Sequence, residues 1–154
     1  MLDALRIDTV SVVGNSFGGS IALAFAKAHP QRVNKLVLMG VVGVSFPITP
    51  GLEKVWGYQP SKAAMKELLQ VFVYDQAMAT DDLAEMRYRA SIRSDVQQRF
   101  ASLFPSPRQR WVDALALDAD SLRRIEPETL VVHGRDDQVI PFSASERLAA
   151  LLPD

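Results

Sequence analysis

Three short apolar runs in this chain have the length and composition of strands in a parallel sheet. They cover residues 10–13, 35–39 and 129–133, and runs of this kind are typical of strands buried on both faces. Between the first two lies Ile21–Ala26, whose apolar periodicity indicates a helix. Strands that alternate with helices predict parallel pairing with right-handed crossovers, so we expect an α/β fold.

The middle of the chain, from residue 41 to about 125, lacks this alternation and carries helix signals instead. Hydroxyl side chains stand where a helix N-cap is needed, and two acidic residues follow one of them in the first turn. We therefore expect a helical insertion between two strands of one sheet. Helices are expected at residues 62–72 after Ser61, at 81–92 after Thr80, and at 108–115 after Pro105 and Pro107.

This pattern divides the chain into three parts. Residues 1–45 are expected to form the first part of the α/β core, residues 46–125 a helical cap, and residues 126–154 the second part of the core. Met1–Ile7 has the pattern of the tail of an amphipathic helix. Ser143–Glu146 has the sequence of a capping box, so the last helix is expected to open there.

Composition excludes several classes of function. A net charge of −1 gives no electrostatic basis for binding nucleic acid or a membrane surface, and no apolar run approaches the ~20 residues that span a bilayer. The absence of cysteine excludes disulfides and thiolate-bound metals, and no other metal-ligand spacing occurs. These features indicate a cytoplasmic globular protein without a metal centre.

The segment Gly14-Asn15-Ser16-Phe17-Gly18-Gly19 carries the most specific chemistry. It lies between an expected strand and an expected helix, which is the context of a nucleophile elbow. The glycines fit this context because the serine would hold a strained backbone with no room for side chains around it. Ser16 is therefore the candidate nucleophile, and the N–H of Phe17, at the helix N-terminus, is a candidate oxyanion donor. The alternative is an ordinary glycine-rich turn.

A second turn agrees with the elbow. Gly134-Arg135-Asp136-Asp137 follows the expected strand at 129–133, and in α/β-hydrolases the acid of the catalytic triad stands on a turn after a late strand. Asp137 takes that position, while Asp136 is expected to face solvent or to make turn hydrogen bonds. The alternative is that both aspartates are ordinary turn formers.

The third triad member, a histidine after Asp137, does not occur in these 154 residues. His29 is expected to end the helix that follows the elbow, and His133 to be a packed core histidine. The strand and loop that carry the second oxyanion donor would precede residue 1. The chain is therefore expected to be incomplete at both ends, and to be inactive and poorly soluble by itself.

Beyond these shared motifs, the chain closely resembles the meta-cleavage product hydrolases of the α/β-hydrolase family, in particular the 2-hydroxymuconic semialdehyde hydrolase group. The resemblance runs through essentially the whole chain, and the motifs of the helical part are the specific ones. Besides the elbow and the acid turn, the motifs are Val55–Ser61, Val73–Asp75, Arg87–Ile92 and Phe104–Trp111.

The resemblance implies a hydrolase without a cofactor that breaks a carbon–carbon bond. Such enzymes ketonise a 2-hydroxy-6-oxo-dienoate formed by ring fission of a catechol and attack its remote ketone, which gives 2-hydroxypentadienoate and a carboxylic acid. The resemblance makes Ser16 the nucleophile and Asp137 the residue that orients the absent histidine. It also implies that Asn15 lines the pocket for the acidic end of the substrate, Arg87 binds the carboxylate and the enolate, and Trp56 is an apolar wall on the ketone side.

Two other functions stay open on the sequence. On spacing alone, a solvated helix face accounts for Arg87 and a packed cap core accounts for Trp56. A carboxylesterase-type serine hydrolase would keep Ser16 and Asp137 but has no reason for the Trp56 and Arg87 motifs. The other alternative is a truncated, non-catalytic binding protein. The partner implied by the resemblance is an anionic dienoate, and a homo-oligomer of the full-length protein is compatible with it.

Overall fold

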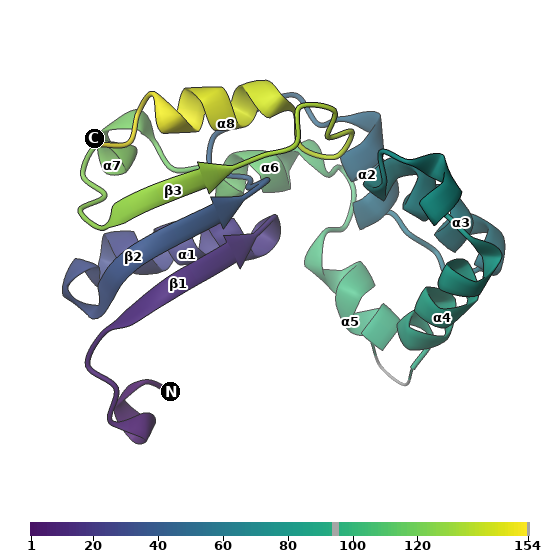
Figure 1. Cartoon of the computed structure of the whole chain (residues 1–154), viewed down its shortest axis with the longest axis horizontal. Coiled ribbons are helices and arrows are strands. Elements are labelled where there is room, and N and C mark those ends of the chain that lie inside the picture. Colours follow the sequence, from purple (N-terminus) through teal and green to yellow (C-terminus); the bar gives the residue numbers. More distant parts are fainter. Residues whose placement is uncertain (94–95, 154) are drawn as a thin grey trace. The chain divides into compact units, whose positions relative to one another are not determined.

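The computed structural model describes residues 1–93 and 96–153, and it confirms the expected α/β fold with parallel strands (Figure 1). Three strands form one sheet in the order β1-β2-β3, and each lies within two residues of its expected position. The strands are β1 (Val10–Asn15), β2 (Val33–Met39) and β3 (Glu128–Val132). The helices are α1 (Phe17–Ala28), α2 (Pro50–Trp56), α3 (Lys62–Phe72), α4 (Asp81–Ser91), α5 (Val96–Leu103), α6 (Gln109–Leu115), α7 (Ala119–Leu122) and α8 (Phe142–Ala149), with 3-10 turns η1 (Asp3–Leu5), η2 (Pro30–Arg32) and η3 (Gln76–Met78).

The chain forms two compact units. Unit 1 comprises Met1–Phe46, Val112–Arg135 and Ile140–Asp154, and it contains the sheet with α1 and α8. Unit 2 comprises Pro47–Trp111 and Asp136–Val139, and it contains α2 to α5. The helical insertion between β2 and β3 is therefore confirmed, whereas the role of residues 46–125 as a cap stays a prediction.

Burial of the sheet in unit 1 is one-sided, although the apolar runs predict strands buried on both faces. Leu36 and Leu38 of β2 are 1% and 0% exposed, and the core around them includes apolar residues of α1 and α8. On the opposite face Val13 and Leu130, which flank Val37 in register, are 67% and 59% exposed. An apolar row that crosses all three strands thus faces outward in this unit.

The two central helices of unit 2 begin where the hydroxyl residues predict. Ser61 accepts a hydrogen bond from the N–H of Ala64 at 3.0 Å, and Thr80 accepts one from the N–H of Leu83 at 3.2 Å. Each bond satisfies one of the N–H groups that the first helical turn leaves without a partner. The apolar sides of these helices then form one buried cluster with Tyr58.

Two predictions about the ends of the chain are wrong. Residues 1–7 hold only the 3-10 turn η1, which has no buried residue and ends at Arg6 with φ 56°. The last helix, α8, opens at Phe142 with Pro141 as its N-cap and without a side-chain cap hydrogen bond. The fixed φ of proline sets the entry of the chain into α8, so the serines of the expected capping box lie inside the helix.

Candidate active site

The turn between β1 and α1 has the backbone geometry of a nucleophile elbow. Ser16 follows directly after the strand with φ 50° and ψ −121°, and α1 begins at the next residue. A positive φ is costly for a residue with a side chain. Two backbone hydrogen bonds hold the turn, from the N–H of Ser16 to Met39 O at 2.9 Å and from the N–H of Gly19 to Ser16 O at 3.0 Å. The expected strain at Ser16 is confirmed.

The glycines around Ser16 differ in what they make room for. A Cβ on Gly14 would lie 2.6 Å from the Cα of Gly19, and a Cβ on Gly19 would lie 1.9 Å from Cγ1 of Val41. A Cβ on Gly18 would meet nothing within 4 Å. The expectation that no side chain fits is therefore confirmed at Gly14 and Gly19 and is wrong at Gly18.

The elbow presents its polar groups at the N-terminus of α1. Ser16 and Phe17 are half-buried and Asn15 is exposed. Although Ser16 is the N-cap residue, its side chain makes no cap hydrogen bond to the helix, so its hydroxyl is not committed to capping. The first N–H groups and the dipole of a helix favour an anion at this position. Attack by the hydroxyl on a carbonyl would create such an anion.

The carboxyl ends of the three strands are level with one another. In register, Asn15 pairs with Met39 and Met39 pairs with Val132. Ser16 and His133, the residues that come next after β1 and β3, therefore leave the same edge of the sheet, and Figure 1 shows the three arrows pointing the same way. In open α/β sheets, ligands bind outside this edge.

Asp137 lies on the turn that follows β3, and its residues 136–139 belong to unit 2. Its Oδ1 accepts a hydrogen bond from the N–H of Val139 at 2.7 Å, and the side chain is half-buried. Asp136 is exposed, as expected. Asp137 is therefore a turn former by its contacts, which does not conflict with a second role as the triad acid.

Thr49 and Gly51 contact this turn, and neither was identified from the sequence. The hydroxyl of Thr49 donates to Val139 O at 2.7 Å, and Gly51 lies so close to the turn that a Cβ there would be 2.1 Å from Gln138 O. The Thr-Pro pair at 49–50 is a helix N-terminus signal, but it gives no sign of a partner 90 residues away in the chain.

The two histidines are both held in structural positions. His29 is the exposed C-cap of α1, at the far end from Ser16, which places it about 18 Å along a twelve-residue helix. The Nδ1 of His133 lies 2.6 Å from Ser145 Oγ, and its Nε2 lies 3.1 Å from Ile140 O. The prediction of a helix-ending His29 is confirmed, and His133 is half-buried and packs edge-on against Phe142.

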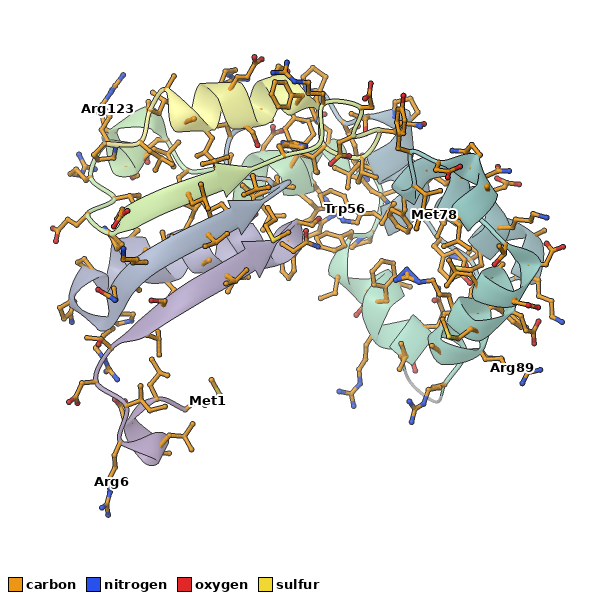
Figure 2. The ribbon with its side chains drawn as sticks, viewed as in Figure 1. Met1, Arg6, Trp56, Met78, Arg89 and Arg123 are labelled. Carbon is orange, nitrogen blue, oxygen red and sulfur yellow. The ribbon has the colours of Figure 1, made fainter. Side chains whose placement is uncertain are left out.

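The remaining candidate residues lie on helices of unit 2. Trp56, labelled in Figure 2, is 5% exposed and stacks on Phe104 with ring centroids 4.1 Å apart. Arg87 is exposed on α4 and makes no ion pair within residues 1–93 and 96–153. Its neighbour Glu85 pairs with Lys62 and Arg89 instead. Thus Trp56 packs in the interior of unit 2, whereas the guanidinium of Arg87 is accessible.

Neither a metal cluster nor a transmembrane helix is found in the described part of the chain. No three His, Asp or Glu side chains among these residues come together in a way that could hold a metal ion. None of the described helices combines the length and the apolar character that crossing a bilayer requires.

Curated proteins similar to this chain are named as hydrolases of 2-hydroxy-6-oxo-dienoates or of 2-hydroxymuconate semialdehyde. A 2-hydroxy-6-oxo-2,4-heptadienoate hydrolase of Pseudomonas putida is 56% identical over 152 residues, which are 99% of this chain and 55% of that protein. A 2-hydroxymuconate semialdehyde hydrolase of a Pseudomonas species is 57% identical over 149 residues, 97% of this chain and 53% of that protein. The chain therefore spans about half the length of the curated relatives it matches.

Solved structures agree with this similarity. A meta-cleavage product hydrolase from Pseudomonas fluorescens matches with a TM-score of 0.96 and 49% identity, over 99% of this chain and 56% of that structure. The predicted resemblance to this group of hydrolases is confirmed. The sequence profile described as alpha/beta hydrolase fold matches residues 1–154. Given this match and the strained serine between β1 and α1, the chain belongs to the alpha/beta hydrolase fold family.

Proposed function

We propose that the protein that contains this chain is a serine hydrolase that cleaves the carbon–carbon bond of a 2-hydroxy-6-oxo-dienoate of the 2-hydroxymuconic semialdehyde type. The observation that carries the proposal is the strained Ser16 at the start of α1, in a chain 57% identical to a 2-hydroxymuconate semialdehyde hydrolase. The reaction needs no cofactor in this proposal, because the substrate itself supplies the electron sink once it has ketonised.

Ser16 is the nucleophile of the proposed reaction. Its Oγ attacks the remote ketone of the ketonised substrate and gives up its proton to a base, and the N–H of Phe17 donates to the oxyanion that forms. The carbon–carbon bond then breaks, its electron pair passes to the dienoate part, and water releases the acyl group as a carboxylic acid. Half-burial of Ser16 and the helix dipole behind it support this role.

The base is a histidine outside residues 1–154, and Asp137 orients it. His29 lies at the opposite end of α1 from Ser16, and both ring nitrogens of His133 have close partners within unit 1. Asp137 is supported by its place after β3, because the loops after β1 and β3 leave the same edge of the sheet. The order serine, acid, histidine is that of the family.

The substrate is an anionic dienoate, and cytoplasmic action on it fits the composition of the chain. Arg87 binds its carboxylate and steadies the enolate, for which a permanently charged planar guanidinium is suited. The accessibility of Arg87 supports this role. Asn15, next to the nucleophile, lines the pocket for the acidic end. Trp56 forms an apolar wall on the ketone side, and its burial makes this the least supported assignment.

The test uses the product of the whole reading frame that encodes this chain. The decay of the yellow ring-fission product of catechol is followed for the parent, Ser16→Ala and Asp137→Asn proteins. We expect Ser16→Ala to lower kcat by about five orders of magnitude and Asp137→Asn by about four. Ser11→Ala, at an exposed serine on the strand that leads to Ser16, is the matched control and should leave kcat unchanged.

Each contrary outcome selects a different function. Unchanged activity in Ser16→Ala would overturn the proposed mechanism. Hydrolysis of p-nitrophenyl esters without any turnover of the dienoate would favour a carboxylesterase. Binding of the dienoate without turnover of either substrate would favour a binding protein.

A further inference from the structure

We propose that Thr49 is a positioning residue for Asp137. Its hydroxyl couples the first turn of α2 to residues 136–139, hereafter the acid turn, and so fixes the direction of the Asp137 carboxylate. The inference rests on the proposed role of Asp137 as the triad acid, and all the contacts that carry it lie within unit 2.

The hydroxyl of Thr49 makes two hydrogen bonds in opposite senses. It accepts from the N–H of Leu52 at 3.0 Å, as an N-cap does. It donates its own hydrogen to Val139 O at 2.7 Å. Because a hydroxyl has only one hydrogen, the donor is used on the acid turn and the cap uses a lone pair. The same oxygen thereby links two segments 90 residues apart.

Val139 connects Thr49 to the Asp137 carboxylate. Its N–H donates to Asp137 Oδ1 at 2.7 Å, while its carbonyl receives the Thr49 hydroxyl. The N–H and the carbonyl of Val139 are thus both hydrogen-bonded, the first to Asp137 and the second to Thr49 at the start of α2. A shift of Val139 would move or release the hydrogen bond that orients Asp137.

Gly51 holds the acid turn from a second direction. A Cβ at this position would lie 2.1 Å from Gln138 O and 2.8 Å from Gln138 C, so the backbone of α2 lies against the backbone of the turn. Close contact at residue 138 and a hydrogen bond at residue 139 fix the turn on both sides of one peptide unit. Triad geometry is sensitive to displacements of about 1 Å, which can cost about a hundredfold in rate.

The chain offers a control that separates this role from ordinary helix capping. Thr80 caps α4 through a single hydrogen bond from the N–H of Leu83 at 3.2 Å, and it belongs to the same unit. Thr49→Val and Thr80→Val each remove one cap bond and keep the side-chain shape. Only Thr49→Val also removes a bond to the acid turn.

Two further variants distinguish the roles of the two hydrogen bonds that the Thr49 hydroxyl makes. Thr49→Asp keeps an oxygen that can accept from Leu52 but has no hydrogen to donate to Val139 when ionised. Thr49→Ser keeps both bonds and serves as the conservative rescue. The kinetics are measured on the product of the whole reading frame, with hydrogen exchange at the Val139 amide as a readout that does not depend on turnover.

We expect Thr49→Val and Thr49→Asp to lower kcat about tenfold with KM changed less than twofold, since a displaced acid affects the chemical step. Thr49→Ser and Thr80→Val should keep kcat within about twofold of the parent. The Val139 amide should exchange about tenfold faster in Thr49→Val, and at the parent rate in Thr80→Val.

Equal kcat values in Thr49→Val and Thr80→Val, or an unchanged exchange rate at Val139, would overturn the inference. Failure of the proposed function has a different signature. If Asp137→Asn keeps the parent kcat, Asp137 is not the triad acid, and the inference falls with it whatever the exchange data show. If Asp137→Asn lowers kcat and Thr49→Val does not, only the role of Thr49 is lost.

Discussion

Backbone geometry fixes the candidate nucleophile in unit 1, whereas Trp56 and Arg87, the candidate substrate residues in unit 2, lie on ordinary helices, one packed and the other exposed. Ser16 sits at φ 50° in a turn that two glycines and two backbone hydrogen bonds define. Trp56 is held by ring stacking, and Arg87 stands on an exposed helix face. The elbow therefore tolerates few sequences, whereas the positions of Trp56 and Arg87 need no special backbone conformation.

This difference suits a division of labour between chemistry and specificity. A nucleophile must be placed precisely, and the strained backbone at Ser16 achieves this with support from Met39 and Val41, which are distant in the sequence. Residues that select a substrate only need an accessible side chain of the right size and charge. The acid turn combines the two modes, because Asp137 Oδ1 accepts from the backbone N–H of Val139, and the carbonyl of Val139 accepts from the Thr49 hydroxyl.

The largest effect on stability is expected for Trp56→Ala in unit 2. The indole is 5% exposed and stacks on Phe104, so its removal leaves a cavity and should destabilise the fold by about 3–5 kcal/mol in urea unfolding. Trp111→Ala is the control, since Trp111 is only half-buried and meets Phe104 edge-on. If Trp56→Ala instead keeps a stability close to the parent value and raises KM, Trp56 lines the substrate pocket and has no packing role.

A smaller effect, about 2–3 kcal/mol, is expected for Gly19→Ala in unit 1. The new Cβ would lie 1.9 Å from Cγ1 of Val41, so α1 and the segment that follows β2 must move apart. Gly18→Ala is the matched control one residue away, where a Cβ meets nothing within 4 Å. It should leave stability unchanged or raise it by up to about 1 kcal/mol, because alanine favours the helix. Equal effects of the two variants in thermal unfolding would contradict this account of the elbow.

Features that depend on neighbouring residues in the chain could be predicted from the sequence. The strand, the glycine-flanked serine and the following helix predicted the elbow, and the hydroxyls of Ser61 and Thr80 predicted two helix starts. The two helix starts are local signals because each cap hydrogen bond joins residues three apart, and the elbow could be predicted because its glycines, its serine and its flanking strand and helix are consecutive in the chain.

Features that depend on residues far apart in the chain could not be predicted. The steric role of Gly19, and not Gly18, depends on Val41. The link from Thr49 to the acid turn depends on Val139. The last helix opens at Phe142, so Ser145 of the expected capping box lies inside α8, where its hydroxyl bonds to His133. In each case the structural role of a residue depends on a partner that is distant from it in the sequence.

His133→Phe should destabilise unit 1 by about 1–2 kcal/mol, since it leaves two buried groups without their partner. Ser145 and Ile140, which face the two ring nitrogens, are 4% and 0% exposed. His29→Phe is the control at the other histidine, which is exposed at the end of α1, and it should stay within about 0.5 kcal/mol of the parent. Similar losses in both variants, measured by urea unfolding, would remove the distinction between a structural and a peripheral histidine.

The smallest effect is expected at the ion pairs of Glu85, on the surface of unit 2. Hydrogen bonds from Lys62 first and from Arg89 second hold the pKa of the Glu85 carboxyl below its usual range, and Figure 2 shows Arg89 extending away from α4. Because the folded-state pKa is the lower one, the pairs stabilise the protein above the unfolded-state pKa of the carboxyl, and this contribution is lost as pH falls through the folded-state value.

Glu85→Gln removes that dependence on pH. We expect its thermal midpoint to lie slightly below that of the parent at neutral pH and to converge with it under acid conditions. Added salt should shrink the neutral-pH difference, because these pairs are solvent-exposed and screened. Glu146→Gln, at an exposed glutamate of α8 without an ion pair among the described residues, controls for the loss of one charge. A difference that persists at low pH and in high salt would mean that Glu85 supports α4 through packing, and unit 2 would then resemble unit 1 in relying on close contacts even at its surface.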